Sequence, residues 1–142
     1  MADDITRLRE TLKKVDFFYS LNFIQLDELI KAMKKKKFKK GEVIIQQGEA
    51  GDAFYMISTG SVSVSIKKGL TEKKVADLAE GAFFGETALV TDSPRNATVT
   101  AQEPTELFVL HKASFKKILL ANPKISAIIK EELAKRKSKN AL

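Results

Sequence analysis

The stretch FFGETALVTDSPRNATV, residues 83–99, organises the chain. It places an acid, Glu86, nine residues before a base, Arg95, and puts Gly85 directly in front of the acid. An ionised carboxylate suits sugar hydroxyls because it only accepts hydrogen bonds, whereas a guanidinium is a charged fork that suits a phosphate. Gly85 permits a close backbone approach, and the short ALV run indicates one helical turn whose free N–H groups face an anion. We interpret the stretch as a small pocket for a phosphorylated sugar.

Length and composition predict a single globular domain over residues 1–142, because 44% of the residues are apolar and 30% are charged. The chain has no cysteine, which excludes disulfides and thiolate chemistry and fits a reducing compartment. One histidine, His111, is too few for a multi-histidine metal site. No run of about 18 apolar residues spans a membrane, and the first residues are not a signal peptide. We therefore expect no catalytic residues, no metal and no cofactor.

The net charge of +7 raises nucleic acid and acidic lipid as partners. The excess comes from two lysine-rich runs, residues 31–40 and 135–139. Neither run contains interleaved aromatic residues of the kind that bind single strands. We expect solvated lysines at a helix end and in a tail, and no nucleic acid partner.

Apolar spacing divides the chain into helical ends and a β-rich middle. Residues 3–16 have the spacing of an amphipathic helix, and Asn22 with Gln25 forms a capping-box pattern before a second helix. We expect helices over residues 3–36, the second one ending in the lysine run. From Gly41 to residue 110, short apolar runs alternate with turn signals.

Strand and helix signals together predict an α+β fold. Residues 61–66 alternate strictly, as a strand with one buried face does, and residues 67–73 read as a hairpin loop. Short antiparallel strands without helical crossovers favour a jelly-roll or sandwich barrel over residues 41–110. Helices return over residues 113–137, where Asn122 and Pro123 restart the helix.

Two blocks of this sequence resemble those of cyclic nucleotide-binding domains. They are GEVIIQQGEAGDAFYMISTGSV, residues 41–62, and FGETALVTDSPRNAT, residues 84–98. The resemblance covers roughly residues 15–133 and is strongest to the C-terminal domain of prokaryotic cyclic nucleotide-gated potassium channels. It implies an eight-stranded antiparallel β-roll, jelly-roll-like, flanked by N-terminal helices and by two C-terminal helices that include a lid.

The resemblance also implies a ligand site, because residues 84–98 correspond to the family's phosphate-binding cassette. Glu86 would bind the ribose 2′-hydroxyl, Arg95 the exocyclic phosphate oxygens, and nearby backbone amides would complete the cradle. Asn96 differs from the threonine or serine of many cGMP-selective members, so cAMP is favoured although both nucleotides are expected to bind. The implied ligand-binding residues are Phe84, Gly85, Glu86, Thr87, Ala88, Arg95, Asn96, Ala97 and Thr98.

The last helix corresponds to the lid that closes over the purine in the family. The candidate base contacts are Ile128, Ile129 and Leu133, with Lys130 near the edge of the base. An equally simple interpretation makes these residues the core face of an amphipathic helix. The lid and the N-terminal helices would relay binding to an effector.

A channel is the host that the layout favours, with a pore domain covalently preceding this segment and the segment itself on the cytosolic side, not inserted in the membrane. One alternative is a free-standing or kinase-associated sensor. Another is the sensor half of a transcription regulator, although no DNA-binding helix-turn-helix follows the lid helix in this sequence. The sequence favours no enzyme among these hosts.

Overall fold

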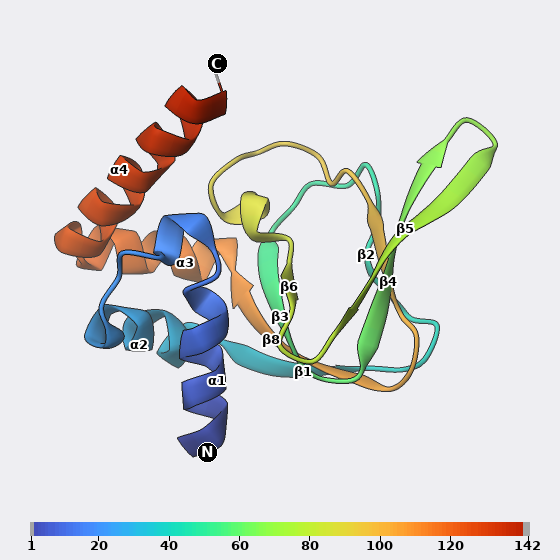
Figure 1. Cartoon of the computed structure of the whole chain (residues 1–142), viewed down its shortest axis with the longest axis horizontal. Helices are drawn as coiled ribbons and strands as arrows, with labels where there is room; N and C mark the ends of the chain where they lie inside the picture. Colours follow the sequence, from blue (N-terminus) through green and yellow to red (C-terminus); the bar gives the residue numbers. More distant parts are fainter. Residues whose placement is uncertain (1, 141–142) are drawn as a thin grey trace. The chain divides into compact units, whose positions relative to one another are not determined.

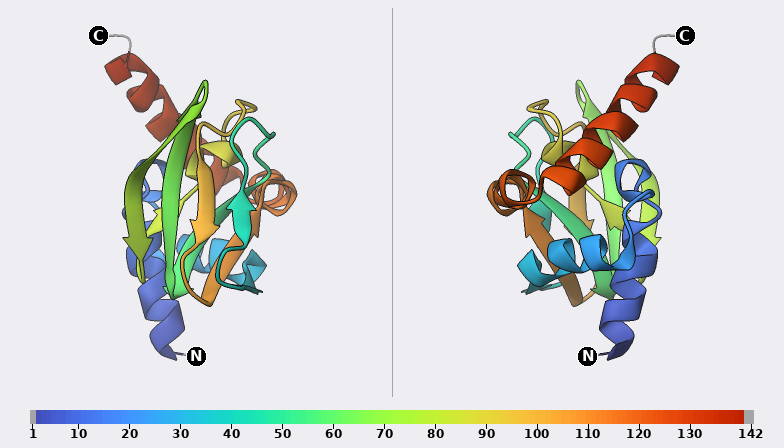
Figure 2. Two further views of the ribbon diagram at one scale, coloured as in Figure 1. Left: turned by 90° about the vertical axis from the view of Figure 1, so that its right-hand side faces the viewer. Right: turned by 90° about the vertical axis from the view of Figure 1, so that its left-hand side faces the viewer.

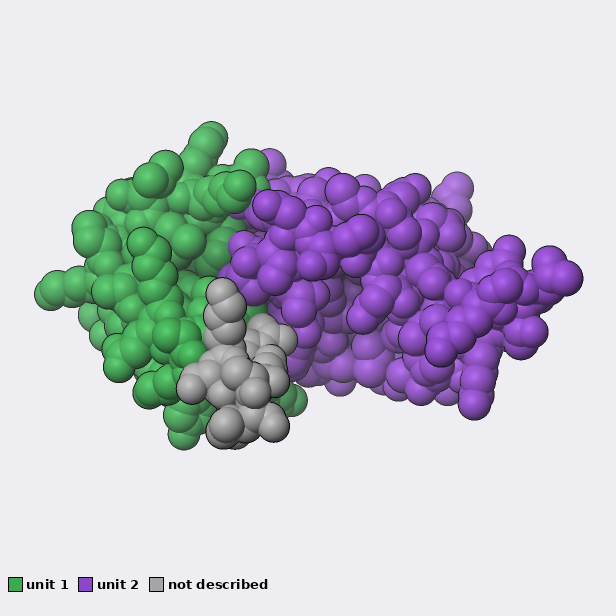
Figure 3. Space-filling view, turned by 90° about the horizontal axis from the view of Figure 1, so that it is seen from above, with its two compact units in different colours: residues 1–32, 113–142 green, residues 33–112 purple. Residues whose placement is uncertain are grey.

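The computed structural model divides the chain into two compact units (Figure 3). Unit 1 contains residues 1–32 and 113–142, and unit 2 contains residues 33–112. The backbone of residues 2–140 and the side chains of residues 4–135 are described.

Unit 2 consists of two four-stranded antiparallel sheets (Figure 1). These eight antiparallel strands confirm the β-roll that the sequence predicts. One sheet has the order β1 (Lys34–Phe38), β8 (Thr105–His111), β3 (Ala53–Thr59) and β6 (Phe83–Phe84). The other has the order β2 (Val43–Ile45), β7 (Thr98–Ala101), β4 (Ser61–Lys68) and β5 (Thr71–Ala79).

The core of unit 2 draws buried side chains from both sheets. Val62 on β4 and Leu107 on β8 are fully buried, and Phe84 on β6 belongs to the same cluster. Apolar residues alternate with polar ones along β4 and β7, so each strand turns one face to this core. The remaining buried members of the cluster are Phe38, Ile45, Ala53, Ile57, Val99, Ala101 and Val109.

The lysine run belongs to a strand, so the prediction of helix up to residue 36 is wrong. The second helix, α2 (Phe23–Ala32), ends before the run, and β1 begins at Lys34. Residues 34–38 pair residue by residue with residues 105–109 of β8. This pairing joins positions about 70 residues apart in sequence, a long-range contact that overrides the good helix propensity of lysine.

The helices of unit 1 come from both ends of the sequence. They are α1 (Ala2–Leu12), the 3₁₀ helix η1 (Asp16–Phe18), α2, α3 (Lys112–Ala121) and α4 (Pro123–Asn140), seen from two further sides in Figure 2. Phe18 of η1 contacts Phe115 of α3 edge to face, with ring centroids 5.9 Å apart. Ser20 donates a hydrogen bond to Glu132 of α4 at 2.9 Å.

The helix predicted over residues 3–16 stops at Leu12. Val15, Phe17 and Phe18 are all buried, and one continuous α-helix would send residues 15 and 17 to nearly opposite sides. A break followed by η1 lets all three face the interior. The predicted capping box is confirmed, because Gln25 N donates to Asn22 Oδ1 at 2.8 Å and Asn22 N donates to Gln25 Oε1 at 3.0 Å.

Pro123 begins α4, as predicted. The side-chain amide of Asn122, however, is hydrogen-bonded to the preceding helix, α3. Its Nδ2 donates to the Ile118 carbonyl of α3 at 2.8 Å, satisfying a carbonyl near the end of that helix.

Candidate functional site

Residues 83–99 form one wall of a cavity in unit 2. After β6, Gly85 adopts a left-handed φ of 78°, and the 3₁₀ helix η2 (Glu86–Leu89) follows, as the predicted single turn. Thr91 closes the turn, because its N–H and its hydroxyl both donate to the Thr87 carbonyl at 2.9 and 3.0 Å. The chain then runs through an irregular segment into β7.

The Arg95 guanidinium occupies a narrow slot beside this turn. Its Nη1 donates to the Gly85 carbonyl at 3.2 Å and its Nη2 donates to the Ala53 carbonyl at 2.7 Å. These two bonds hold the group in place and leave further N–H donors of the guanidinium for a ligand. Among residues 4–135, no carboxylate forms an ion pair with Arg95, so its charge remains available to an anion.

Two glycines make room for this guanidinium. A Cβ at Gly85 would lie 2.9 Å from Arg95 Nη1, and a Cβ at Gly51 would lie 3.1 Å from Arg95 Cζ and 2.7 Å from the Cβ of Ala88. Gly85 is further required by its positive φ, whereas Gly51 has no such constraint. Glycine at position 51 is therefore explained by the lack of space for a Cβ beside Ala88 and Arg95.

The backbone of Arg95 is held as firmly as its side chain. Its N–H donates to the Glu49 carbonyl and its carbonyl accepts from Gly48 N, both at 2.8 Å. The loop after β2 thus fixes the position from which the guanidinium enters the cavity.

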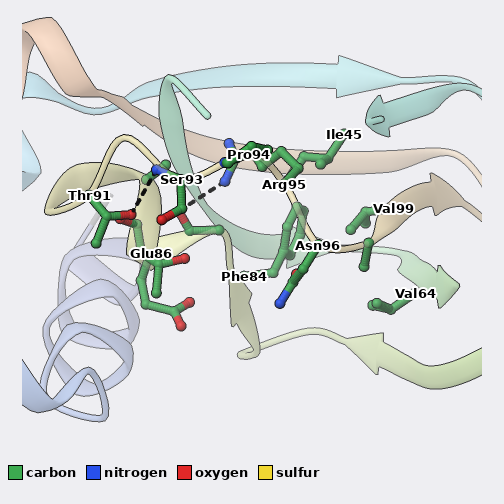
Figure 4. Close-up of a pocket in the computed structure, with 14 residues that line it drawn as sticks. Ile45, Val64, Phe84, Glu86, Thr91, Ser93, Pro94, Arg95, Asn96 and Val99 are labelled. Atoms are coloured by element: carbon green, nitrogen blue, oxygen red, sulfur yellow. Dashed lines mark hydrogen bonds between the residues drawn. The ribbon is translucent and has the colours of Figure 1, made fainter. Parts of the chain in front are cut away.

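The cavity has a volume of about 420 Å³, within the range of small-molecule sites (Figure 4). Glu86 and Arg95 bring opposite charges to it, and Thr91 and Ser93 add hydroxyl groups. An apolar wall comes from both sheets through Ile45, Val64, Phe84 and Val99.

Tyr55 supports this wall from behind. Its ring stacks on Phe84 with centroids 5.1 Å apart and an interplanar angle of 14°. Burial raises the pKa of the Tyr55 hydroxyl, the negative charge of Asp52 raises it further, and the Arg95 charge lowers it.

Most of the site residues expected from the sequence lie together. Those that line the cavity are Phe84, Gly85, Glu86, Thr87, Ala88, Arg95, Asn96 and Ala97. Thr98 does not line it. Its Oγ1 accepts from Gln47 N at 3.0 Å and it lines a different cavity with Gln46 and Gln47, because strand alternation turns Thr98 away from the side that Val99 faces.

The candidate lid residues belong to α4 in unit 1, where this helix packs against η1. Ile129 is 2% exposed and Ile128 and Leu133 are half-buried, whereas Lys130 is exposed. Burial of Ile129 matches the interpretation of these residues as the core face of an amphipathic helix.

Several residues that line the cavity are not predicted from the sequence. Thr91, Ser93 and Pro94 lie inside the quoted stretch, where only charged and small residues were singled out, and Ile45 comes from β2. Gly51 is missed as well, although the GEAGD turn cluster marks the place where it lies. An apolar residue such as Ile45 cannot be recognised in the sequence as a cavity residue, because the core and the cavity wall both require apolar side chains.

Among the described residues, no helix is both long and apolar enough to cross a membrane. Within the same part of the chain, no group of three or more histidine, aspartate or glutamate side chains is placed to hold a metal ion.

Comparison with known sequences matches this arrangement to one family. The model of the cyclic nucleotide-binding domain matches residues 35–122. A cAMP-dependent protein kinase regulatory subunit from Blastocladiella emersonii is 36% identical over 115 residues, covering 80% of this chain and 28% of that protein. The cyclic nucleotide-gated potassium channel mll3241 from Mesorhizobium japonicum is 33% identical over 134 residues, covering 94% of this chain and 36% of the channel. The chain thus spans about a third of the length of these relatives.

Solved structures show the same fold. The regulatory domain of Toxoplasma gondii PKA, crystallised with cAMP, superposes with a TM-score of 0.73 at 30% identity, over 82% of this chain and 44% of that one. The N-terminal domain of a transcriptional regulator from Streptomyces coelicolor A3(2) reaches a TM-score of 0.81 over 92% of this chain and 94% of that one, and its 24% identity shows the fold alone.

Proposed function

The chain belongs to the cyclic nucleotide-binding domain family, and we propose that its cavity between Phe84 and Ala97 binds cAMP, and cGMP less tightly. Members of this family are sensor domains whose ligand is a cyclic nucleotide. The observation that carries the proposal for these residues is Arg95, whose guanidinium is fixed in the cavity wall without a carboxylate partner among residues 4–135. A cyclic phosphate is an anion of the right size and charge for such a group.

Each polar group of the cavity has a role in this proposal. Arg95 binds the exocyclic phosphate oxygens, and Glu86 accepts a hydrogen bond from the ribose 2′-hydroxyl. Backbone N–H groups of residues 85–88 complete the phosphate cradle. Both side chains line the cavity already, so the ligand meets groups that need little rearrangement.

The purine is assigned to the apolar wall. Val64 and Val99 would give apolar contact to either base, and Asn96 would contact the base edge through its amide. Position 96 holds an asparagine where many cGMP-selective members have a threonine or serine, which favours cAMP. Thr98 is left out of the contact set because it lines another cavity.

Calorimetric titration with cAMP and cGMP tests the ligand, and Arg95→Ala tests the site. A charge-assisted hydrogen bond contributes about 1.5–3 kcal/mol, so the variant should bind cAMP about tenfold or more weakly. Arg7→Ala, which removes an arginine of α1 in unit 1, serves as the matched control and should bind normally. Equal affinity of Arg95→Ala and the wild-type chain would place the ligand elsewhere.

We further propose that binding is relayed to a channel pore through movement of the helices of unit 1. In this scheme Ile128, Ile129 and Leu133 contact the base in the bound state and Lys130 lies near its edge, so binding favours a closed arrangement. The match to the potassium channel supports this host, because it extends over 94% of the chain and includes the helical ends. The chain would then lie on the cytosolic face of a membrane.

A kinase regulatory subunit is the second candidate host, favoured by 36–39% identity to several cAMP-dependent protein kinase regulatory subunits. A chimera distinguishes the two hosts. This chain replaces the matching segment of the Mesorhizobium japonicum channel, and potassium flux from vesicles is measured with and without cAMP. Flux that increases with cAMP supports the channel, and flux that is indifferent to bound cAMP contradicts it.

A further inference from the structure

Lys112 is the first residue of α3, and its side chain is bonded to the loop beside the cavity. It is the last residue of unit 2, and the chain passes into unit 1 at the next position. Its backbone N–H donates to the Asp52 carbonyl at 2.8 Å, which fixes the start of the helix. Its side chain is only 16% exposed, far less than a lysine free to extend into water.

The ammonium group of Lys112 reaches the loop that follows η2. Nζ donates to the Thr91 carbonyl at 2.8 Å and to Asp92 Oδ1 at 2.5 Å. The Asp92 side chain is 96% exposed, so water screens this ion pair, and the bond to the carbonyl supplies the geometric constraint.

Thr91 continues the connection into the cavity. Its side chain lines the cavity, its Oγ1 accepts from Ser93 N at 3.4 Å, and its N–H and hydroxyl both donate to Thr87 of η2. A shift of η2 or of the segment leading to Arg95 therefore moves the carbonyl to which Lys112 is bonded. Arg95 ends this segment, and its guanidinium is hydrogen-bonded to the Gly85 carbonyl that precedes η2.

We propose that Lys112 is a positioning residue that transmits movement of the nucleotide-bound loop, residues 86–95, to the beginning of α3. The inference rests on the proposed function, because the nucleotide is the ligand that would bind this loop. A ligand shifts a two-state element only through contacts that differ between its states. In this proposal the bonds from Lys112 to Thr91 and Asp92 are the contacts that change when the loop moves.

The test compares hydrogen exchange of the α3 amides, residues 113–121, in the full chain with and without saturating cAMP. The wild-type chain should change its exchange in α3 on binding. Lys112→Met keeps the length of the side chain but removes every donor, so it should lose this ligand-dependent change. Its cAMP affinity should fall less than about tenfold, the middle of the range of ordinary coupling effects, because Arg95 and Glu86 are untouched.

Two variants separate the coupling role from a structural one. Lys112→Arg retains donors and should restore the ligand-dependent exchange, and Lys116→Met removes an exposed lysine of the same helix and should behave as wild type. If Lys112→Met fails to fold by circular dichroism, Lys112→Leu, which also has no donor, replaces it.

The outcomes also separate this inference from the function on which it rests. The coupling role alone is overturned if Lys112→Met binds cAMP normally and still shows the ligand-dependent exchange change in α3. It is also overturned if the wild-type chain binds cAMP without any exchange change in α3. Failure of the wild-type chain to bind either nucleotide in the calorimeter overturns the proposed function and this inference together.

Discussion

At the scale of single residues, the site depends on two glycines whose missing side chains leave space for Arg95. Arg95 carries the charge, but its position follows from the space beside Gly51 and Gly85 and from two carbonyls that accept its N–H groups. A guanidinium fixed in this way loses little rotamer freedom on binding an anion, which favours affinity.

Gly51→Ala isolates the space requirement, because the φ of Gly51 is not positive and alanine adopts the backbone without strain. The new Cβ would lie 2.7 Å from the Cβ of Ala88 and 3.1 Å from Arg95 Cζ, so neighbours must shift. Overpacking of this kind costs about 1–3 kcal/mol. We expect a lower midpoint of thermal unfolding and cAMP binding weakened by about tenfold, the effect of losing roughly 1.4 kcal/mol.

The double variant Gly51→Ala with Ala88→Gly identifies the cause of the weaker binding. Removing the Ala88 Cβ relieves the closest contact and should restore part of the stability, while affinity stays low because Arg95 remains displaced. Unchanged cAMP affinity in Gly51→Ala would show that the slot does not position Arg95.

Sequence reasoning succeeds at this scale wherever a residue's chemistry is distinctive. Glu86 and Arg95 are identified from charge and spacing, and both line the cavity. Ile45 and Gly51 are not identified, because an apolar residue and a turn glycine have many ordinary uses. Thr98 lines a different cavity from the other expected site residues, because β7 turns Thr98 and Val99 to opposite faces.

At the scale of elements, α1 and α2 are joined by a bidentate pair. Arg9 Nε and Nη2 donate to the two oxygens of Asp27, each at 2.8 Å. The hydrogen bond from Arg9 is the largest influence that lowers the pKa of Asp27, which is part-exposed. A carboxylate whose folded pKa is lowered adds stability above its unfolded pKa and loses it as pH falls through the folded value.

We therefore expect the stability difference between the wild-type chain and Asp27→Asn to stay constant from neutral pH down to about 5. It should shrink as pH falls below about 4, the ordinary range of an aspartate. Urea unfolding of both proteins across this pH range measures the difference. A difference that grows toward acid pH would contradict the assigned pKa direction.

The lysine run of β1 lies at the edge of its sheet and its four lysines are exposed. Lysines on an edge strand hinder pairing with another chain, because like charges meet. Lys35→Val with Lys37→Val should therefore promote self-association, seen as larger species in size-exclusion chromatography with light scattering. Lys116→Val with Lys117→Val removes the same charge from the helix α3. This control variant should elute as a species of the same size as the wild-type chain.

The same strand shows why one element is predicted wrongly. Lysine favours helices, and no glycine or proline interrupts the run before Gly41. Only the partner strand β8, about 70 residues further along, makes extended backbone the better choice. The capping box at Asn22 is predicted correctly because both of its partners lie within one turn.

At the scale of the whole molecule, binding and folding are linked. A ligand that binds only the folded chain adds about 2.7 kcal/mol at a concentration 100 times its Kd. For a chain of this size that should raise the unfolding midpoint by about 5–10 °C, measured by calorimetry with cAMP. Arg95→Ala at the same cAMP concentration should show a clearly smaller rise, and an equal rise would point to another binding site.

The sequence by itself determines the fold class, the family and the charged pair of the site. These follow from local patterns: alternation, turn residues, and two motif blocks read in order. The tertiary structure decides that residues 34–38 are a strand, that Gly51 makes space for Arg95, and that Lys112 is bonded to the cavity loop. Each of these joins residues 20 to 75 positions apart, and such contacts leave no local signal because the energy that creates them exists only once the two segments meet.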